Sequence, residues 1–297
     1  MYQIAQFMTN LFGLKSLVFF LFFLCFTNLS AQNEQAFKIY TAKGKSISYK
    51  KMQESSSKKE LVLFGEFHDN PITHWLQYEL MLSLYDVHQT NLVLGFEMFE
   101  QDQQGVVDRY LSGELNEKQF KDSCRLWENY TTDYKPLLDF AKDKKLTCIA
   151  SNVERKYASL LFKKGRAALD TLSPLIRSQM ADNYFKLDTT LSQYIAVREM
   201  FPSKGKGMVE AQAFKDATMA KFIMKEMKNN KVVLHFNGAF HSDYYQGILW
   251  YIQQEKPEVK ALTISTVSQK NINKLDAENL GKADFIICVP ESMTKTH

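Results

Sequence analysis

The sequence predicts an α/β fold with a mostly parallel central sheet, helices on both of its faces and a helical lobe. Short continuous apolar runs recur along the chain, as is typical of strands buried on both faces. Segments of helical periodicity lie between these runs, and such alternation indicates a parallel sheet. One long stretch without a strand-like run, residues 154–230, predicts the lobe.

The first 31 residues are expected to be a secretory signal peptide. Lys15 precedes an apolar run over residues 16–26, and a short polar stretch then ends at the small residue Ala31. The run is shorter than the ~20 apolar residues that a membrane span needs. We therefore expect cleavage near Ala31 and export, to the periplasm or in association with the outer membrane. An uncleaved anchor is the alternative, and Cys25 follows large apolar residues, which does not support a lipid anchor.

The rest of the chain is expected to form a lead-in segment and one domain. The lead-in, residues 32–59, contains a candidate strand at 37–41 or 47–49 and becomes polar and Ser-rich towards its end. Residues 60–297 are long enough for a single α/β domain. The helical insertion lies around residues 154–230 of that domain.

The apolar runs and the helical periodicity place the elements in order. Strands are expected at residues 61–65, 91–96, 145–150, 231–236, 259–266 and 284–289. Pro71 opens the first helical pattern, which reaches residue 85. Further helices are expected at residues 101–111 and at 115–145, with a break at 130–135. The helices of the lobe are interrupted near Pro174 and around residues 202–207.

The composition excludes several classes of function. The 37 Lys and Arg residues nearly balance the 33 Asp and Glu residues, and no basic cluster is present, so nucleic-acid binding has no support. Cys124, Cys148 and Cys288 would remain after signal cleavage, and an odd count argues against a disulfide framework. Cys148 and Cys288 lie in strand-like runs and are expected to be core residues.

Polar side chains follow four predicted strands at the point where each strand ends. In chain order they are Glu66, His68 and Asp69, then Glu97, then Ser151 and Asn152, then Asn237 and His241. Ligands of open α/β sheets bind at the carboxyl ends of the strands, where these groups would meet. His68 and His241 each close a Gly-x-x-His turn, in which the glycine lets the backbone leave the sheet sharply. The sequence therefore predicts a functional site at this edge.

The residue types at this edge allow more than one chemistry. His68, Glu97 and His241 are suited to holding a divalent cation, with Glu66 as the general base on a bound water. The same groups could equally serve in acid–base chemistry without a metal. Taken singly, each residue has an ordinary structural interpretation, such as a hydrogen-bonded histidine for His68. His74 would either line the same cleft or only pack beside it.

A set of motifs occurs in a fixed order over residues 60–250 and resembles one known family. The motifs are residues 63–69 with His74, residues 95–99, residues 134–138 with Ala141, residues 150–155, Gln212 with residues 216–220, and residues 237–241. Together they resemble the ChaN-like haem-binding lipoprotein family, within the wider Tiki and TraB-like superfamily. Two departures are the unconvincing lipoprotein cysteine and Glu154, which stands where the family often has a proline.

The resemblance implies an exported α/β protein with a helical lobe that binds haem for iron acquisition. Haem in related proteins can lie between two protomers and be ligated through tyrosine. This implies a homodimer and outer-membrane haem uptake machinery as partners, with Tyr134 as the candidate ligand. The residues of the matching motifs that are carried over as haem-site residues are His68, His74, Asn152 and Asn237.

The wider superfamily implies a different class of function, a metal-dependent hydrolase. Its paired Gly-x-x-His motifs and acidic residue match His68, His241 and Glu97. A haem-binding protein is thus the first hypothesis and a divalent-metal-dependent hydrolase the second. A third is that the strand-end groups form only a buried hydrogen-bonded network.

Overall fold

The computed structural model describes residues 35–228 and 230–296. The predicted signal peptide at residues 1–31 lies outside this part of the chain. Contacts separate residues 1–36 from a compact unit that begins at Phe37, and the fold described below is that of the second unit. Among the helices of the described residues, none combines the length and the apolar character needed to cross a membrane.

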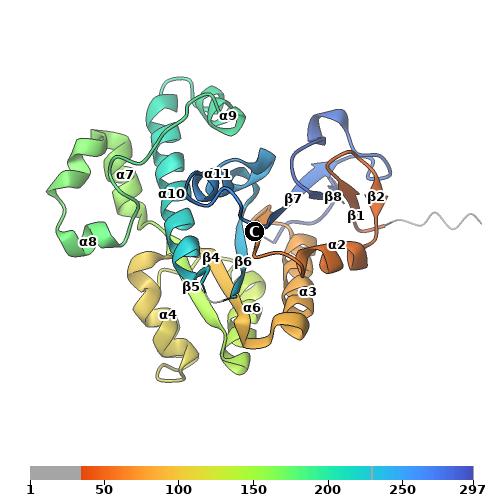
Figure 1. Ribbon diagram of the computed structural model, residues 1–297, viewed down its shortest axis with the longest axis horizontal. Coiled ribbons are helices and arrows are strands. Elements are labelled where there is room, and N and C mark those ends of the chain that lie inside the picture. Colours follow the sequence, from red (N-terminus) through yellow and green to blue (C-terminus); the bar gives the residue numbers. More distant parts are fainter. Residues whose placement is uncertain (1–34, 229, 297) are drawn as a thin grey trace, which may run out of the picture. The chain divides into compact units, whose positions relative to one another are not determined.

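An eight-stranded sheet forms the centre of the unit, in the order β2-β1-β8-β7-β3-β6-β4-β5 (Figure 1). The strands are β1 (Lys38–Thr41), β2 (Ser46–Ile47), β3 (Leu61–Glu66), β4 (Leu92–Glu100), β5 (Thr147–Asn152), β6 (Val232–Gly238), β7 (Ala261–Gln269) and β8 (Phe285–Pro290). All neighbours from β8 to β5 are parallel, whereas β1 is antiparallel to both β2 and β8. The predicted mostly parallel sheet is confirmed, and its six predicted strands correspond to β3–β8.

Helices connect the strands and cover both faces of the sheet. They are α2 (Tyr49–Ser56), α3 (Pro71–His88), α4 (Gln104–Leu111), α5 (Glu117–Ser123), α6 (Lys135–Lys144), α7 (Arg155–Lys164), α8 (Pro174–Ser178), α9 (Ser192–Met200), α10 (Gly205–Glu226) and α11 (Ile248–Glu255). Short turns of helix add η2 (Gln89–Asn91), η3 (Gln101–Gln103), the π-helix η4 (Tyr130–Tyr134), η5 (Arg166–Thr171), η6 (Ala239–His241), η7 (Asp243–Tyr245) and η8 (Ala277–Asn279).

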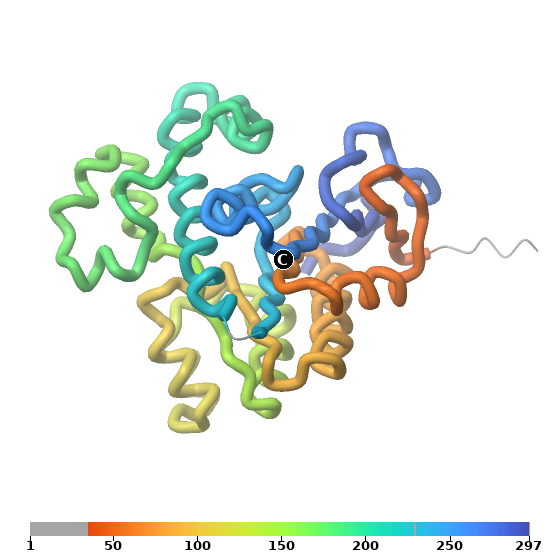
Figure 2. The backbone as a smooth tube through the Cα atoms, in the orientation of Figure 1, coloured from red at the N-terminus to blue at the C-terminus, as the bar shows by residue number. Residues whose placement is uncertain are grey.

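Alternate side chains of the central strands point to opposite cores, because successive strand residues face opposite ways. Val62 and Phe64 of β3 pack in the core formed with α3, α4, α5 and α6. Leu61 and Leu63 of the same strand pack in the core formed with α7, α9, α10 and α11. In Figure 2 the orange and yellow tube of α3–α6 lies in the lower part of the view, and the green and cyan tube of α7–α10 lies in the upper left part.

The stretch predicted to form the helical lobe, residues 154–230, contains α7, α8, α9 and the long helix α10 (Figure 1). The sequence predicts an interruption around residues 202–207, yet α10 already begins at Gly205. A side chain at this position would lie 2.7 Å from the carbonyl oxygen of Arg198. Gly205 therefore starts the helix and also lets α9 approach it closely.

The lead-in segment contributes regular structure at one edge of the sheet. Its residues 38–41 form β1, which pairs with β8, and residues 49–56 form α2. Ser48 caps α2 through its side chain, which accepts a hydrogen bond from the Lys51 amide. The Ser-rich stretch at the end of the lead-in thus overlaps the end of this helix.

Candidate functional site

The two Gly-x-x-His turns lie side by side, because β3 and β6 are parallel neighbours with Glu66 opposite Gly238. A β-carbon at Gly238 would lie 2.9 Å from Nε2 of His68. A β-carbon at Gly65 would lie 2.9 Å from the carbonyl oxygen of Ile264. Both glycines are therefore needed for close approach across the sheet edge, and His68 lies directly against the second turn.

Glu66 is a buried carboxylate with three side-chain donors. Its Oε1 lies 2.8 Å from Nδ1 of His68 and accepts a 2.5 Å hydrogen bond from the Tyr134 hydroxyl. Its Oε2 accepts a hydrogen bond from the Gln77 amide. Burial opposes ionisation, but the hydrogen bond from His68 and the other favourable interactions outweigh it and lower the pKa of Glu66.

His68 presents Nδ1 to Glu66, and its Nε2 lies close to Gly238 of the second turn. Its side chain is 39% exposed, and Trp127 packs edge-on against the ring with 4.8 Å between centroids. Burial favours the neutral ring, but the hydrogen bond to Glu66 and the charge of Glu97 outweigh it and raise the pKa of His68. Within residues 35–228 and 230–296, Nε2 of His68 has no hydrogen-bond partner.

Side chains behind the cavity hold the backbone of His68 and the carboxylate of Glu66 in place. His74 is buried, with its Nδ1 3.0 Å from Oε1 of Gln77 and its Nε2 3.0 Å from the carbonyl oxygen of His68. Asn129 donates to that same carbonyl at 2.9 Å and to Asp133 at 2.8 Å. His74 therefore supports the site from behind. Sequence reasoning missed Gln77, Asn129 and Asp133, since no spacing connects them with the strand ends.

The other half of the site centres on His241, which lies between two carboxylates. Its Nε2 is 3.1 Å from Oε1 of Glu97, and its Nδ1 is 2.5 Å from Oδ1 of Asp216. Tyr194 donates to the other oxygen of Asp216 at 2.8 Å. Burial opposes the charge of His241, but Glu97 and then Asp216 outweigh it and raise its pKa to about 10. Burial also opposes the charge of Glu97, whose pKa is nevertheless held well below its usual range by His241.

Glu97 also links the two strands. The backbone amide of Gly238 donates to its Oε2 at 2.7 Å. The sequence places Glu97 at a strand end, whereas Asp216 lies in the middle of α10 and is indicated by the family motif at residues 216–220 rather than by its distance from a strand. A buried acid on an otherwise apolar face of that helix is the signal that identifies it.

A buried polar chain braces β6 beneath the site. Ser151 lies 2.8 Å from Nε2 of His235, and Nδ1 of His235 lies 3.1 Å from Oδ1 of Asn237. Asn237 in turn donates to Ser242 at 3.0 Å. Burial lowers the pKa of His235 to about 4, so the ring is neutral near pH 7. This chain holds the second Gly-x-x-His turn in place.

A cavity of about 550 Å³ opens on the strand ends. It is lined by Glu66, Phe67, His68, Asp69, Asn70, Gln212, Gly238, Ala239, Phe240, His241, Ser268, Pro290, Glu291, Met293 and Lys295. Of the residues predicted for the site, Glu66, His68 and His241 line this cavity. Five others lie outside its lining, namely His74, Glu97, Tyr134, Asn152 and Asn237. Asn152 lies on the edge strand β5, and its buried Oδ1 has no hydrogen-bond partner among the described residues.

Comparison with known families gives the same assignment as the motifs. The model of the family described as haem-binding uptake, Tiki superfamily, ChaN, matches residues 52–252. The chain belongs to this ChaN family. The match covers both Gly-x-x-His turns and α10, and residues 52–252 include every residue predicted for the site.

Solved structures share the fold of this ChaN family member. ChaN of Campylobacter jejuni, whose structure shows cofacial haem binding, is 18% identical with a TM-score of 0.63, over 86% of this chain and 97% of that chain. A mutant of the erythromycin esterase EreC is 10% identical with a TM-score of 0.51, over 87% and 98%. A succinoglycan biosynthesis protein is 10% identical with a TM-score of 0.51, over 84% and 92%. Comparison with curated proteins finds no match.

The predicted cation site at His68, Glu97 and His241 is not supported by this geometry. In the described part of the chain, no group of three or more His, Cys, Asp or Glu side chains is arranged to hold a metal ion. Both ring nitrogens of His241 face carboxylates, so neither directs a lone pair towards the cavity. The predicted role of Glu66 as a base on metal-bound water depends on the same cation, so that role is not supported either.

Tyr134, the candidate haem ligand by resemblance, lies behind Glu66. Its side chain is fully buried, and its hydroxyl donates to Glu66. Burial and the neighbouring carboxylate raise the pKa of Tyr134, which opposes the phenolate form that binds iron. In this conformation the ring therefore has no access to a ligand in the cavity.

Proposed function

We propose that this protein binds haem in the strand-end cavity, where His68 would hold the iron. The observation that carries the proposal is the state of the His68 ring. Its Nδ1 is fixed by the buried Glu66, and its Nε2 has no partner in the described chain. Metal-ligating histidines usually donate their second N–H to a carboxylate, which orients the ring and increases its basicity. Histidine is a common axial ligand of haem.

The walls of the cavity suit a flat, mostly apolar ligand with acidic groups at one edge. Phe67, Ala239, Phe240 and Met293 provide apolar surface, and the Phe240 side chain is exposed at its position. Lys295 supplies a cation at the rim. A volume of about 550 Å³ lies within the usual range for small-molecule sites. Haem would contribute its iron as the Lewis acid, and the chain would contribute the His68 nitrogen as its ligand and the apolar walls.

The test is a hemin titration of the mature protein, followed by absorbance and electron paramagnetic resonance. A saturable Soret shift is expected with the unmodified chain, and His68→Ala should remove the signal of an axial nitrogen ligand. His88→Ala is the matched control, because His88 lies at the opposite end of α3 and bonds to Ser57. Hemin binding that is identical in His68→Ala and the control would refute the assignment of the ligand.

We infer further that the protein is exported and takes part in haem or iron acquisition. The cation and apolar run of residues 15–26, with Ala31 after them, support export. Fractionation of cells and N-terminal sequencing of the mature chain test it, and a retained N-terminus in the cytoplasmic fraction would contradict it. Growth of a deletion strain on hemin as its iron source tests the role in uptake.

The homodimer and the contact with outer-membrane uptake machinery are also proposals, and family membership supports them. Light scattering of the purified chain with and without hemin tests the first, and co-purification from membranes tests the second. A metal-dependent hydrolase is not proposed, because Glu97 and Asp216 engage the two nitrogens of His241 that would be needed for a metal.

A further inference from the structure

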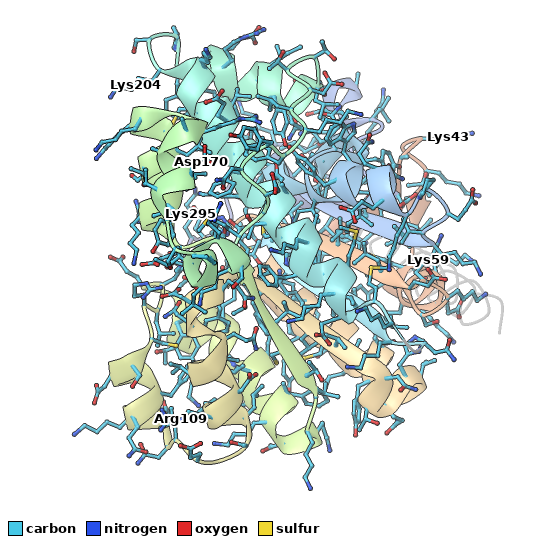
Figure 3. All side chains as sticks on the ribbon, turned by 60° about the vertical axis from the view of Figure 1, so that its left-hand side comes forward. Lys43, Lys59, Arg109, Asp170, Lys204 and Lys295 are labelled. Atoms are coloured by element: carbon cyan, nitrogen blue, oxygen red, sulfur yellow. The ribbon has the colours of Figure 1, made fainter. Side chains whose placement is uncertain are left out.

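The segment after β8 runs along the mouth of the cavity. We call residues 291–296 the C-terminal strap. Three of its residues, Glu291, Met293 and Lys295, line the same cavity as His68. Lys295 is labelled in Figure 3. Its side chain contacts Asp69 in the loop that follows β3. The strap thus forms one wall of the site, although the motifs of the sequence do not include it.

The far end of the strap is held by the loop after β3 and by the π-helix η4, both of which border the His68 half of the site. Lys295 forms a 2.5 Å ion pair with Asp69, and the amide of Thr296 donates to the Asp69 carbonyl at 2.9 Å. The Thr296 hydroxyl donates to Asp133 at 3.3 Å. Asp69 directly follows His68, and Asp133 lies 3.4 Å from His74. The position of the strap is therefore tied to the residues around His68.

The contacts that hold the C-terminal strap are weak compared with those that hold the strands and helices of the sheet. The strap has no regular secondary structure, and all of its residues except Met293 are exposed. Lys295 is 71% exposed in its ion pair with Asp69, and exposed ion pairs contribute little because water screens them. Segments with few buried contacts and exposed hydrogen bonds open most readily.

We propose that the C-terminal strap is a movable wall that opens to admit the ligand and closes over it. On closure Lys295 exchanges Asp69 for a carboxylate of the ligand, and Met293 packs against the apolar part. The exchange is possible because Lys295 already lies at the rim of the cavity, 71% exposed, and pairs there with the partly exposed Asp69. This inference rests on the proposed haem function, since it requires an amphipathic ligand with acidic groups.

The decisive experiment measures access to His68 without any ligand. Diethyl pyrocarbonate modifies unprotonated histidine, and peptide mass spectrometry gives the rate for His68 with His88 as the internal reference. Removal of residues 291–297 should raise the rate at His68 several-fold and leave that at His88 unchanged. Lys295→Glu, which repels Asp69 without shortening the chain, should act in the same direction. Lys260→Ala is the control, because this exposed lysine precedes β7 at the amino-terminal ends of the strands, away from the site at their carboxyl ends.

Stopped-flow mixing with hemin gives the second readout. The shortened chain should bind and release hemin faster than the full chain. Lys295→Ala should weaken binding of hemin about two- to fivefold and leave binding of hemin dimethyl ester, which lacks the carboxylates, unchanged. An equal loss for hemin and its ester would overturn the exchange of partners by Lys295.

The two readouts separate failure of the strap from failure of the haem function. If the His68 labelling rate is the same with and without the strap, the movable wall is overturned whatever hemin does. If labelling accelerates but neither chain binds hemin, the wall is supported and the haem function fails.

Discussion

Nδ1 of His68 and Oε1 of Glu66 lie 2.8 Å apart, and this contact joins a half-exposed ring to a fully buried acid. The contact raises the pKa of the ring and lowers that of the acid, so both partners favour the charged pair. A haem iron that binds the neutral Nε2 of His68 must therefore compete with a proton for that nitrogen. This relationship makes the proposed haem site sensitive to pH in a direction that can be checked.

Glu66→Gln is expected to shift the pH dependence of hemin binding to lower pH. In the unmodified chain the raised pKa of His68 means that affinity falls as the pH drops through that pKa, because Nε2 becomes protonated. Loss of the carboxylate charge returns the pKa of His68 towards its ordinary value near 6.5. Soret absorbance across a pH series gives the midpoints, with the exposed Glu258→Gln as the control. A midpoint that does not move would show that Glu66 does not set the protonation of the ligand.

Gly238→Ala is expected to impair binding much more than folding. The new methyl group would lie 2.9 Å from Nε2 of His68, so the ring must swing away. Because the ring is half-exposed and can move, the cost in stability is about 1 kcal/mol, at the low end for overpacking. Because the His68 ring is then displaced from its position as a ligand of the iron, hemin binding should weaken about tenfold or more.

Gly105→Ala is the matched control for that substitution. Gly105 is in the helix α4, and apart from its chain neighbours and the backbone of that helix, no heavy atom of the described residues lies within 4 Å of a β-carbon at this position. Alanine should therefore stabilise the fold by about 0.5–1 kcal/mol and leave hemin binding unchanged. Urea unfolding and hemin titration of both variants test the pair, and equal effects on binding would refute the close approach of the two turns.

The strands and the location of the site could be predicted from the sequence because both depend on local patterns. Buried parallel strands are continuous apolar runs, and the residues after them must meet at one edge. This logic correctly placed Glu66, His68 and His241 around one cavity. The partners of these residues come from helices and loops with no fixed spacing to the strands, as with Asp216 in α10 and Gln77 in α3.

How deeply each side chain is buried was harder to predict from the sequence than the strand end or motif to which it belongs. Tyr134 lies in a motif of the family, yet the direction of a side chain from the irregular helix η4 cannot be deduced from sequence. The strap was missed for a related reason, since an exposed polar segment carries no periodicity. Its role depends on where β8 ends relative to β3, which is a property of the assembled sheet.

Tyr134→Phe is expected to leave the hemin spectrum unchanged. The hydroxyl donates to Glu66 and lies outside the cavity lining, so its removal takes one hydrogen bond from a buried carboxylate. A hydrogen bond to a charged group contributes about 1.5–3 kcal/mol, and unfolding in urea should show a loss of that order. Neither the unmodified chain nor Tyr134→Phe is expected to show a phenolate-to-iron charge-transfer band. Such a band in the unmodified chain that disappears in the variant would return the role of ligand to Tyr134.

His241→Gln is expected to destabilise the fold and to change its response to alkaline pH. The imidazolium is buried between Glu97 and Asp216, and its removal leaves two uncompensated acids, at a cost of about 3–5 kcal/mol. The folded pKa of His241, about 10, exceeds its unfolded value, so its stabilisation is complete below pH ~6.5 and is lost as the pH rises towards 10. Unfolding in urea at pH 6, 8 and 10 should thus show a decline in the unmodified chain that is much shallower in the variant. His88 is half-buried, and its variant His88→Ala, the control, should show the same decline in stability as the unmodified chain. Parallel declines in His241→Gln and the unmodified chain would show that His241 is not charged in the folded protein.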